Sequence, residues 1–422
     1  METSLLVGVT SILVLGIGAQ WISWRLRLPS ILIMLIFGVL AGPVAGVLNP
    51  DAIFGELLFP LVSVFVGVVL FEGGLNLEFD ELKKRGGVIH GLILIGVAVT
   101  WILSSVAAHW ILGFSWPIAV LQGAILVVTG PTVVIPLLQY IRPTGRISSI
   151  ARWEGIMNDP IGAILAVIVF EAIVTGSFGS ANAAALRQFV ETILVGSAIG
   201  AIGAALLILP LTNYWIPDYL ENSVTLMMVV AVFTASNLLH HESGLLATTI
   251  MGIVLANQPW RTVHHIIEFK EDLRVLLLST LFIILAARLD PSYLADIDAS
   301  ALIFLGVLIV LIRPLAMVLS TARSDLEWEE TAFLSWLAPR GIVAAAVSAI
   351  FAEELVNQGY PEAEALVPVT FLVIAGTVAL YGLTAGPLAR WLGLADPDPQ
   401  GFLIVGAHEW ARDIARVLND EG

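Results

Sequence analysis

The sequence contains no cysteine, which excludes disulfide bonds and thiolate chemistry. Charge is also scarce: charged residues make up 13% of the 422 positions, against roughly 25% in a typical soluble domain. The 19 basic residues are outnumbered by 34 acidic ones, and the resulting net charge of -15 provides no basic surface for nucleic acid. Nucleic-acid binding and a disulfide-stabilised fold are therefore excluded.

Apolar residues take the place of the missing charge. They make up 58% of the chain, and the mean hydropathy is +0.94, as in a membrane protein that crosses the bilayer many times. A helix needs about 20 apolar residues to cross the hydrocarbon core. We therefore predict an all-α polytopic membrane protein with about 13 spanning segments, at roughly 3–24, 29–48, 56–76, 87–113, 116–140, 148–175, 188–212, 220–239, 243–257, 270–288, 299–320, 328–352 and 366–392.

The basic residues predict the orientation. If the N-terminus lies outside, 15 of the 19 Lys and Arg residues fall in cytoplasmic loops, and the outer loops hold only Arg187 and Arg288. This bias is the positive-inside rule and favours an odd number of spans with a cytoplasmic C-terminus. The predicted location is the cell membrane, plasma or inner. The outer loops are acidic, either as ordinary solvated loops or as a weak cation-concentrating mouth.

Two predicted segments are broken in the middle. The fifth contains Val128-Thr129-Gly130-Pro131-Thr132, and the twelfth contains Ala338-Pro339-Arg340-Gly341. Proline removes a helix hydrogen bond and glycine relaxes the backbone. Non-helical backbone at membrane depth survives where protein packs it or where it lines a cavity. Paired interrupted helices in corresponding halves of a chain indicate the binding site of a transporter.

A charged segment, 152–160, opens an otherwise apolar run. An ionisable residue inside a bilayer is by default a candidate functional residue. Asp159 falls near the predicted midplane, where burial disfavours its charged form, so that the carboxyl group can hold either a proton or a cation. Asn158 is its uncharged neighbour, which favours one-for-one, electroneutral exchange. Glu154 shares a helix face with Asn158.

Two arginines lie within predicted membrane segments and require partners. A buried unpaired arginine is untenable, and Arg340 is the only strongly basic residue centrally placed in the other half. We therefore predict a structural salt bridge between Glu154 and Arg340. Arg313 has no partner that the sequence identifies.

Other oxygen ligands cluster around the first break. The hydroxyl groups of Thr129 and Thr132, together with backbone carbonyls freed around Gly130, suit Na⁺ or K⁺. Glu72 ends an apolar run in Phe71-Glu72-Gly73-Gly74. It is either a helix end near the interface or a second carboxylate near the ion-binding site.

The last residues, 396–422, differ from the rest. The run 402–405 indicates a strand, and 409–418 has helical periodicity. This arrangement resembles the opening of the Rossmann-like nucleotide-binding domains attached to potassium transporters, which would make residues 1–395 the transmembrane domain and place any nucleotide on a missing C-terminal part. An ordinary cytoplasmic tail is the alternative.

Taken together, these motifs resemble the NhaP-type branch of the monovalent cation:proton antiporters, the group that includes the sodium/proton exchangers. The resemblance covers roughly residues 5–393 and rests on Glu154, Asn158-Asp159, the first break, 71–74 and Arg340-Gly341. It implies an NhaA-like fold of inverted repeats with two crossing broken helices, core helices at about 87–175 and 299–392, and a homodimer in lipid. It also implies Asp159 as the carrier.

One position departs from that family. Gly130 stands where members commonly have aspartate, which removes a carboxylate and brings K⁺ to nearly even terms with Na⁺. We predict a secondary antiporter that exchanges Na⁺ or K⁺ for H⁺ in pH homeostasis, with no covalently bound cofactor and no enzymatic activity. A gated cation channel and an organic-anion symporter on a similar fold are the alternatives.

Overall fold

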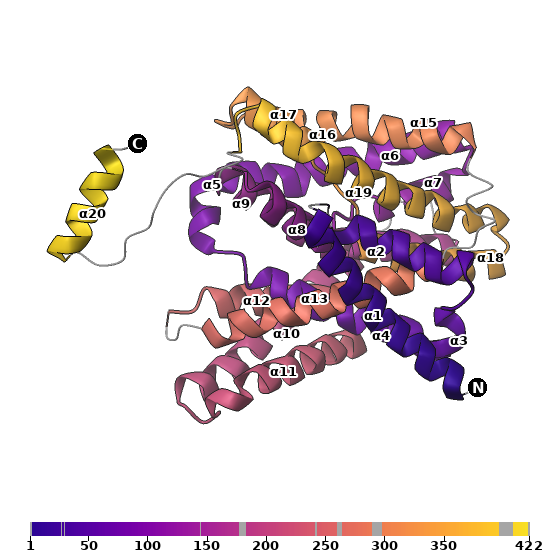
Figure 1. Cartoon of the computed structure of the whole chain (residues 1–422). Coiled ribbons are helices and arrows are strands. Elements are labelled where there is room, and N and C mark those ends of the chain that lie inside the picture. The colour runs from indigo at the N-terminus through magenta and orange to yellow at the C-terminus, as the bar shows by residue number, and fades with distance from the viewer. Residues whose placement is uncertain are drawn as a thin grey trace.

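The computed structural model describes residues 2–26, 28, 30–143, 145–176, 183–240, 243–259, 264–288, 298–395 and 408–420. Every regular element in these ranges is a helix (Figure 1). Each of the predicted apolar segments coincides with helical structure, so the all-α prediction is confirmed. Within the described ranges, eight helices are long and apolar enough to cross a membrane, and shorter apolar helices accompany them. The count of 13 spans stays a prediction.

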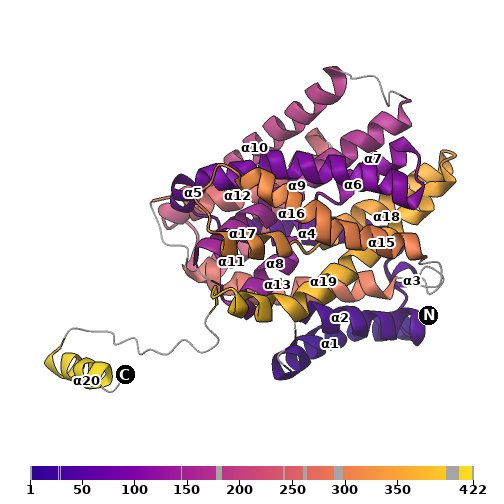
Figure 2. The same cartoon turned by 90° about the horizontal axis from the view of Figure 1, so that it is seen from above.

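One group of helices packs around α12. The α4 and α10 helices both lie against α12, and α13 packs against α1 and α2. These contacts join the N-terminal helices to those in the middle of the chain (Figure 2). The group consists of α1 (Glu2–Leu26), α2 (Ser30–Val39), η1 (Leu40–Val44), α3 (Pro50–Phe54), η2 (Gly55–Leu57), α4 (Leu58–Gly74), α10 (Ala183–Thr212), α11 (Asp218–Leu239), α12 (Ser243–Ala256) and α13 (His264–Ala287).

A second group contains two repeats of the same order. Each repeat has a helix interrupted by a π-helical segment, then a broken helix, then a long helix. The first consists of α5 (Phe79–Gly91), η3 (Leu92–Gly96), α6 (Val97–Leu112), α7 (Trp116–Ile125), α8 (Pro131–Ile141) and α9 (Gly145–Val174). The second consists of α15 (Ala299–Val307), η4 (Leu308–Ile312), α16 (Arg313–Thr321), α17 (Trp328–Trp336), α18 (Ile342–Asn357), η5 (Pro361–Ala365) and α19 (Leu366–Trp391).

The repeats pack against each other through their first helices. The α15 helix lies against α6, and η3 lies against α16. A π-helical segment inserts an extra residue into the turn and is often found at functional sites. Because η4 ends at Ile312, the residue that follows the insertion is Arg313, one of the two intramembrane arginines.

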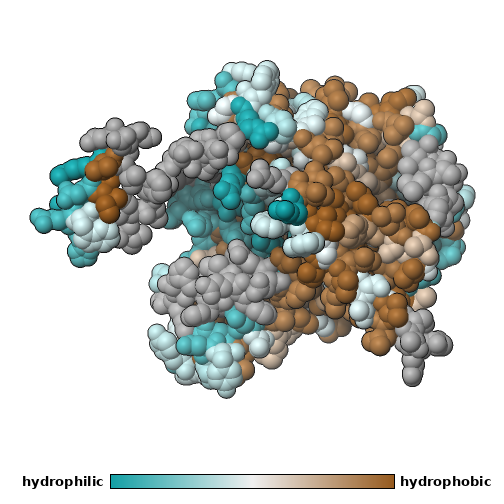
Figure 3. All heavy atoms as spheres, viewed as in Figure 1, coloured by the Kyte–Doolittle hydropathy of each residue, from teal (hydrophilic) through white to brown (hydrophobic). Residues whose placement is uncertain are grey.

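The molecular surface is largely apolar where it would meet lipid. Large side chains such as Leu94, Leu206 and Val310 are more than half exposed. Figure 3 shows a broad hydrophobic area on one face, with hydrophilic residues gathered toward one end. Contiguous exposed apolar surface of this kind marks a face that contacts membrane or protein. The surface therefore fits a chain whose solvent is the bilayer.

The tail is described only in its last helix, α20 (Glu409–Asp420). The helix agrees with the predicted helical periodicity there. The predicted strand at 402–405 lies outside the described residues. The division into a domain at 1–395 and a regulatory tail at 396–422 therefore stays a prediction.

Candidate functional site

The two broken helices leave four helix ends inside the protein. The first break separates α7 from α8, and the second separates α17 from α18; Gly130 and Leu337 within them have extended backbone. Helix ends carry unsatisfied carbonyl groups at the C-terminus and unsatisfied N–H groups at the N-terminus. Their partial charges make a break a place where buried ions or charged side chains are stabilised.

Arg340 lies within the second break, and its side chain approaches backbone carbonyls of the first break. Its side chain is 2% exposed, and Nη1 approaches the carbonyl oxygens of Val127 and Val128 at 3.4 and 3.5 Å. These carbonyls follow the C-terminal end of α7, where the helix dipole favours a cation. Its backbone N–H donates to Thr377 Oγ1 at 3.4 Å. Arg340 therefore links the two breaks.

The predicted salt bridge between Glu154 and Arg340 is wrong. Glu154 pairs instead with Arg313, which donates from Nη1 to Glu154 Oε1 and from Nη2 to Glu154 Oε2 at 2.9 Å. Arg313 also donates to the carbonyls of Leu334 and Leu337 at 2.8 and 2.9 Å. These carbonyls lie at the C-terminal end of α17. Each arginine thus contacts backbone carbonyls at the C-terminal end of the first half of one broken helix. Arg313 is the arginine that also pairs with Glu154.

Asp159 faces the first break from α9, which runs uninterrupted through Pro160. Gly155 and Gly162 lie four residues before and three after Asp159, so all three share a helix face. A Cβ at Gly155 would lie 3.3 Å from Val134, and a Cβ at Gly162 would lie 2.6 Å from Val128. This face therefore packs directly on residues 128–134, and Asp159, 1% exposed, is held against the break.

Gly162→Ala is expected to damage the site more than Gly155→Ala. The added methyl group at 162 would lie 2.8 Å from the backbone nitrogen of Val128, so the break itself must move, whereas at 155 only a Val134 methyl must shift. Overpacking costs about 1–3 kcal/mol, and the gain of about 1 kcal/mol in helix propensity offsets the smaller clash. Thermal unfolding in detergent and transport by both variants would check this; equal effects would contradict it.

The polar atoms around Asp159 lack donors. Within the described ranges, both carboxylate oxygens of Asp159, Oδ1 of Asn158 and Oγ1 of Thr129 are buried without a hydrogen-bond partner. Buried polar groups normally have partners, because an unsatisfied one costs free energy. A cluster of buried oxygens around one carboxyl group is suited to receive a proton or a small cation.

Gly130 and Thr132 are the other predicted ligands at the break, and their role stays a prediction. The Gly130 carbonyl accepts the N–H groups of Val133 and Val134, both at 3.1 Å, and so starts α8. Gly130 also supplies no side chain. Thr132 lies in the first turn of α8, but its side chain lies outside the described part of the structure.

Glu72 is paired with a basic residue of α13. Arg274 of α13 donates from Nη1 to Glu72 Oε1 at 3.1 Å, and both side chains are largely buried. The neighbouring Gly73 packs on Ile156 of α9, one turn from Asp159. Glu72 is thus held in an ion pair close to the helix that carries Asp159.

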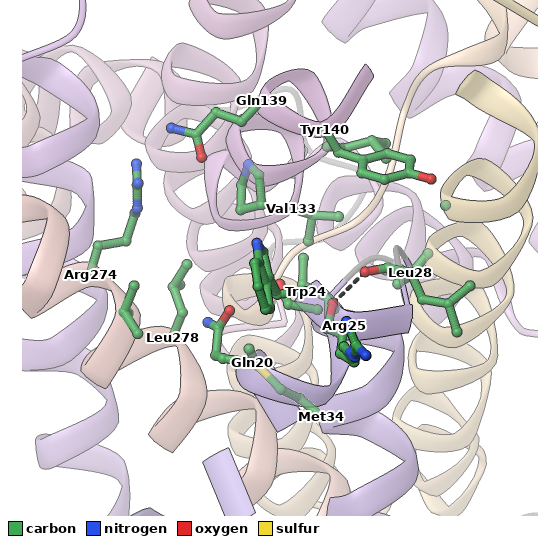
Figure 4. A pocket seen from close by; sticks show the side chains of 18 residues that line it. Gln20, Trp24, Arg25, Leu28, Met34, Val133, Gln139, Tyr140, Arg274 and Leu278 are labelled. Carbon is green, nitrogen blue, oxygen red and sulfur yellow. Dashed lines mark hydrogen bonds between the residues drawn. The ribbon is translucent and has the colours of Figure 1, made fainter. Parts of the chain in front are cut away.

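A cavity of about 520 Å³ lies between the two helix groups. Gln20, Trp24 and Arg25 of α1 line it on one side, and Val133 and Tyr140 of α8 line it on the other (Figure 4). Val133 lies two residues beyond the start of α8, so the cavity reaches the first turn after the break. Arg274 and Leu278 of α13 complete the wall.

A second cavity, of about 380 Å³, is acidic. Asp298, Glu362 and Glu364 line it. Hydrogen bonds from the Ser300 hydroxyl and the Ala301 N–H hold the pKa of Asp298 below its ordinary value, so this carboxylate stays ionised. Glu362 accepts the Ser115 N–H at 3.0 Å. Some of the predicted outer acidic residues therefore lie together.

Two crossed broken helices with a buried carboxylate define a secondary transporter of the inverted-repeat class. Residues 9–391 match the family model described as "Sodium/hydrogen exchanger, transmembrane". The chain belongs to this family, as its motifs predicted.

Individual relatives carry cation/proton antiporter names. The K(+)/H(+) antiporter NhaP of Alkalimonas amylolytica is 30% identical over 410 residues, which cover 94% of this chain and 68% of that protein. Na(+)/H(+) antiporter 1 of Methanocaldococcus jannaschii is 26% identical over 401 residues, covering 90% of this chain and 91% of that protein. The solved structure of the sodium proton antiporter MjNhaP1 from the same organism at pH 8 superimposes with a TM-score of 0.79 at 23% identity, covering 92% and 99% of the two chains. The structural likeness confirms the fold.

Sequence reasoning missed the roles of Arg274 and Arg313. A signal existed for Arg313, which stands inside the apolar segment 299–320, whereas Arg274 follows Glu271 and Asp272 at the charged start of segment 270–288 and gave none. Their partners lie 159 and 202 residues away, and no local spacing connects them.

Proposed function

We propose that this chain exchanges Na⁺ or K⁺ for H⁺, with Asp159 as the group that carries them in turn. One observation supports this most: a buried carboxylate without a partner in the described residues, held against a broken helix. A lone buried carboxylate is costly when charged and unpaired, so it is occupied by either a proton or a cation. Because the proton and the cation compete for the Asp159 carboxylate, the transport of one is coupled to the transport of the other.

Asn158 and Thr129 would complete the cation's shell with amide and hydroxyl oxygens, both buried beside the break. Hard oxygen ligands suit alkali cations. A single carboxyl group with a neutral amide neighbour supports one cation for one proton, which moves no net charge. The pair of Glu72 with Arg274 supports the same stoichiometry, since it adds no net charge.

Alternating access would come from movement of the two repeats against the other helices. The cavity between the groups is the path by which an ion reaches the break. Arg25 and Arg274 line it, and the positive-inside rule assigns their end of the molecule to the cytoplasm. We therefore propose a multi-pass cell-membrane protein with its N-terminus outside and its C-terminus in the cytoplasm, acting as a homodimer in lipid and serving pH homeostasis.

The test is exchange by the purified protein in liposomes. Outward gradients of Na⁺, K⁺ and Li⁺ are imposed side by side, and an internal dye reports pH. We expect acidification driven by Na⁺, K⁺ or both, because the relatives bear names for each ion. With the membrane potential clamped at different values, the final pH should not change; a potential-dependent end point would contradict electroneutral exchange.

The alternatives predict other outcomes. A gated cation channel would carry current far above the turnover of a carrier and would need no proton. An organic-anion symporter would require substrate contact by Arg340, which instead approaches the carbonyls of Val127 and Val128. Neither the family nor its named relatives favour these readings.

A further inference from the structure

We propose that Arg274 is a positioning residue that tunes how tightly the transported cation is held, by acting as a tethered cation on Glu72. The inference rests on the proposed exchange at Asp159 and adds a residue outside that site. Arg274 belongs to α13, in the helix group that packs around α12, whereas Asp159 belongs to the repeats.

The geometry places Arg274 between the cavity and Glu72. It lines the 520 Å³ cavity at one side (Figure 4). It also lines a small separate cavity, together with Glu72 and with Asn222 and Thr225 of α11. Its guanidinium group therefore contacts Glu72 from the wall of the path that leads toward the break.

Glu72 is close enough to the carrier helix to matter electrostatically. Gly73 packs so tightly on Ile156 that a Cβ there would lie 3.3 Å from Ile156 Cγ1. Ile156 precedes Asp159 by three residues and shares its side of α9. Both carboxyl groups are buried, and charges in such surroundings are poorly screened.

The positive charge of Arg274 affects how strongly a cation binds at Asp159. With Arg274 present, the Glu72–Arg274 pair is neutral, and an arriving cation senses mainly Asp159. Removal of the guanidinium takes this partner away from Glu72, and while Glu72 stays ionised the surroundings of Asp159 are more negative by one unit. A cation then binds more tightly and leaves more slowly, because release must overcome the extra attraction. The neutral Glu72–Arg274 pair therefore favours rapid release of the cation over tight binding.

The Glu72–Arg274 pair lies within one helix group, the one that packs around α12. The α4 and α13 helices hold it on the stationary side of the proposed movement, facing α9. The tuning charge would therefore be sensed only while the repeats hold Asp159 near it. This would make cation release easier on that side of the membrane.

The experiment measures KM and maximal rate for the transported cation in liposomes, with five variants, one of which is Glu72→Gln alone as the baseline for the double variant. At alkaline pH, where protons compete least for Asp159 and Glu72 stays ionised, Arg274→Gln should lower KM by roughly fivefold or more, the low end of usual coupling between two sites, and should lower the maximal rate. Arg274→Lys keeps the charge and should retain values near the unmodified protein. Arg288→Gln, directly after the far end of the same helix and paired with Asp51, is the matched control and should change neither constant.

The double variant Glu72→Gln/Arg274→Gln separates charge from packing. It removes both charges, so KM should return toward that of the unmodified protein. If Arg274→Gln leaves KM unchanged, or lowers it equally when Glu72 is already Gln, the proposal is overturned. If the unmodified protein shows no cation-driven proton exchange, the proposed function fails instead. If Arg274→Gln does not fold, Glu72→Gln decides the question: it leaves the charge of Arg274 uncompensated, so KM should rise, and an unchanged KM would overturn the proposal.

Discussion

Asp159→Asn is expected to reduce cation-driven proton exchange to the level of protein-free liposomes. The substituted amide has nearly the same shape but can neither hold a transferable proton nor supply negative charge to a cation. Within the described ranges no other carboxyl group is buried without a partner in the break, so no group replaces it. Dye-reported pH changes under imposed Na⁺ and K⁺ gradients would measure the loss.

The matched control for this variant is Glu171→Gln on the same helix. Glu171 lies 12 residues beyond Asp159, near the end of α9, and accepts a hydrogen bond from Gln188 that glutamine can also accept. We expect this variant to keep its exchange activity. Exchange that persists in Asp159→Asn, or is lost equally in both variants, would contradict the assignment of Asp159 as the carrier.

Arg313→Gln is expected to be among the most destabilising single substitutions in the chain. It removes the bidentate pair with Glu154 and the hydrogen bonds to the carbonyls of Leu334 and Leu337. Breaking a buried ion pair by removing one partner costs about 3–5 kcal/mol, because the other charge stays buried without compensation. Thermal unfolding in detergent should therefore show a large decrease in Tm.

A pair of double-mutant cycles distinguishes the observed pairing from the predicted one. Substitution of both Glu154 and Arg313 by glutamine should cost less than the sum of the single substitutions, since no charge remains buried alone. The cycle between Glu154 and Arg340 should show a smaller interaction energy, because Arg340 contacts backbone carbonyls and not the carboxylate. Larger coupling to Arg340 would restore the predicted salt bridge.

Much of the fold followed from local pattern. Long apolar runs predicted the helices, and Pro and Gly at 130–131 and 339–341 predicted both breaks, because these residues act on the backbone within one turn. The prominence of Asp159 also followed from the sequence, since charge at membrane depth is costly wherever it occurs. Its role as ion carrier stays a prediction.

Partner choice did not follow from the sequence. Two intramembrane arginines, Arg313 and Arg340, could pair with Glu154. The sequence favoured Arg340 because it lies in the second break. The structure instead assigns each arginine to the carbonyl end of one broken helix, which leaves Arg313 beside Glu154. Glu72 likewise pairs with Arg274, which lies 202 residues away in the sequence.

The sequence by itself thus determined that the chain is a helical membrane protein with two broken helices and a buried carboxylate at 159. Periodicity, composition and backbone chemistry are local properties, and they act the same way wherever the segment packs. The tertiary structure alone decided which charges meet, which face of α9 lies on the break, and where a cavity opens. The two buried ion pairs join residues more than 150 positions apart, and the packing of α9 on the break joins residues 21 and 34 positions apart, so no local pattern encodes either.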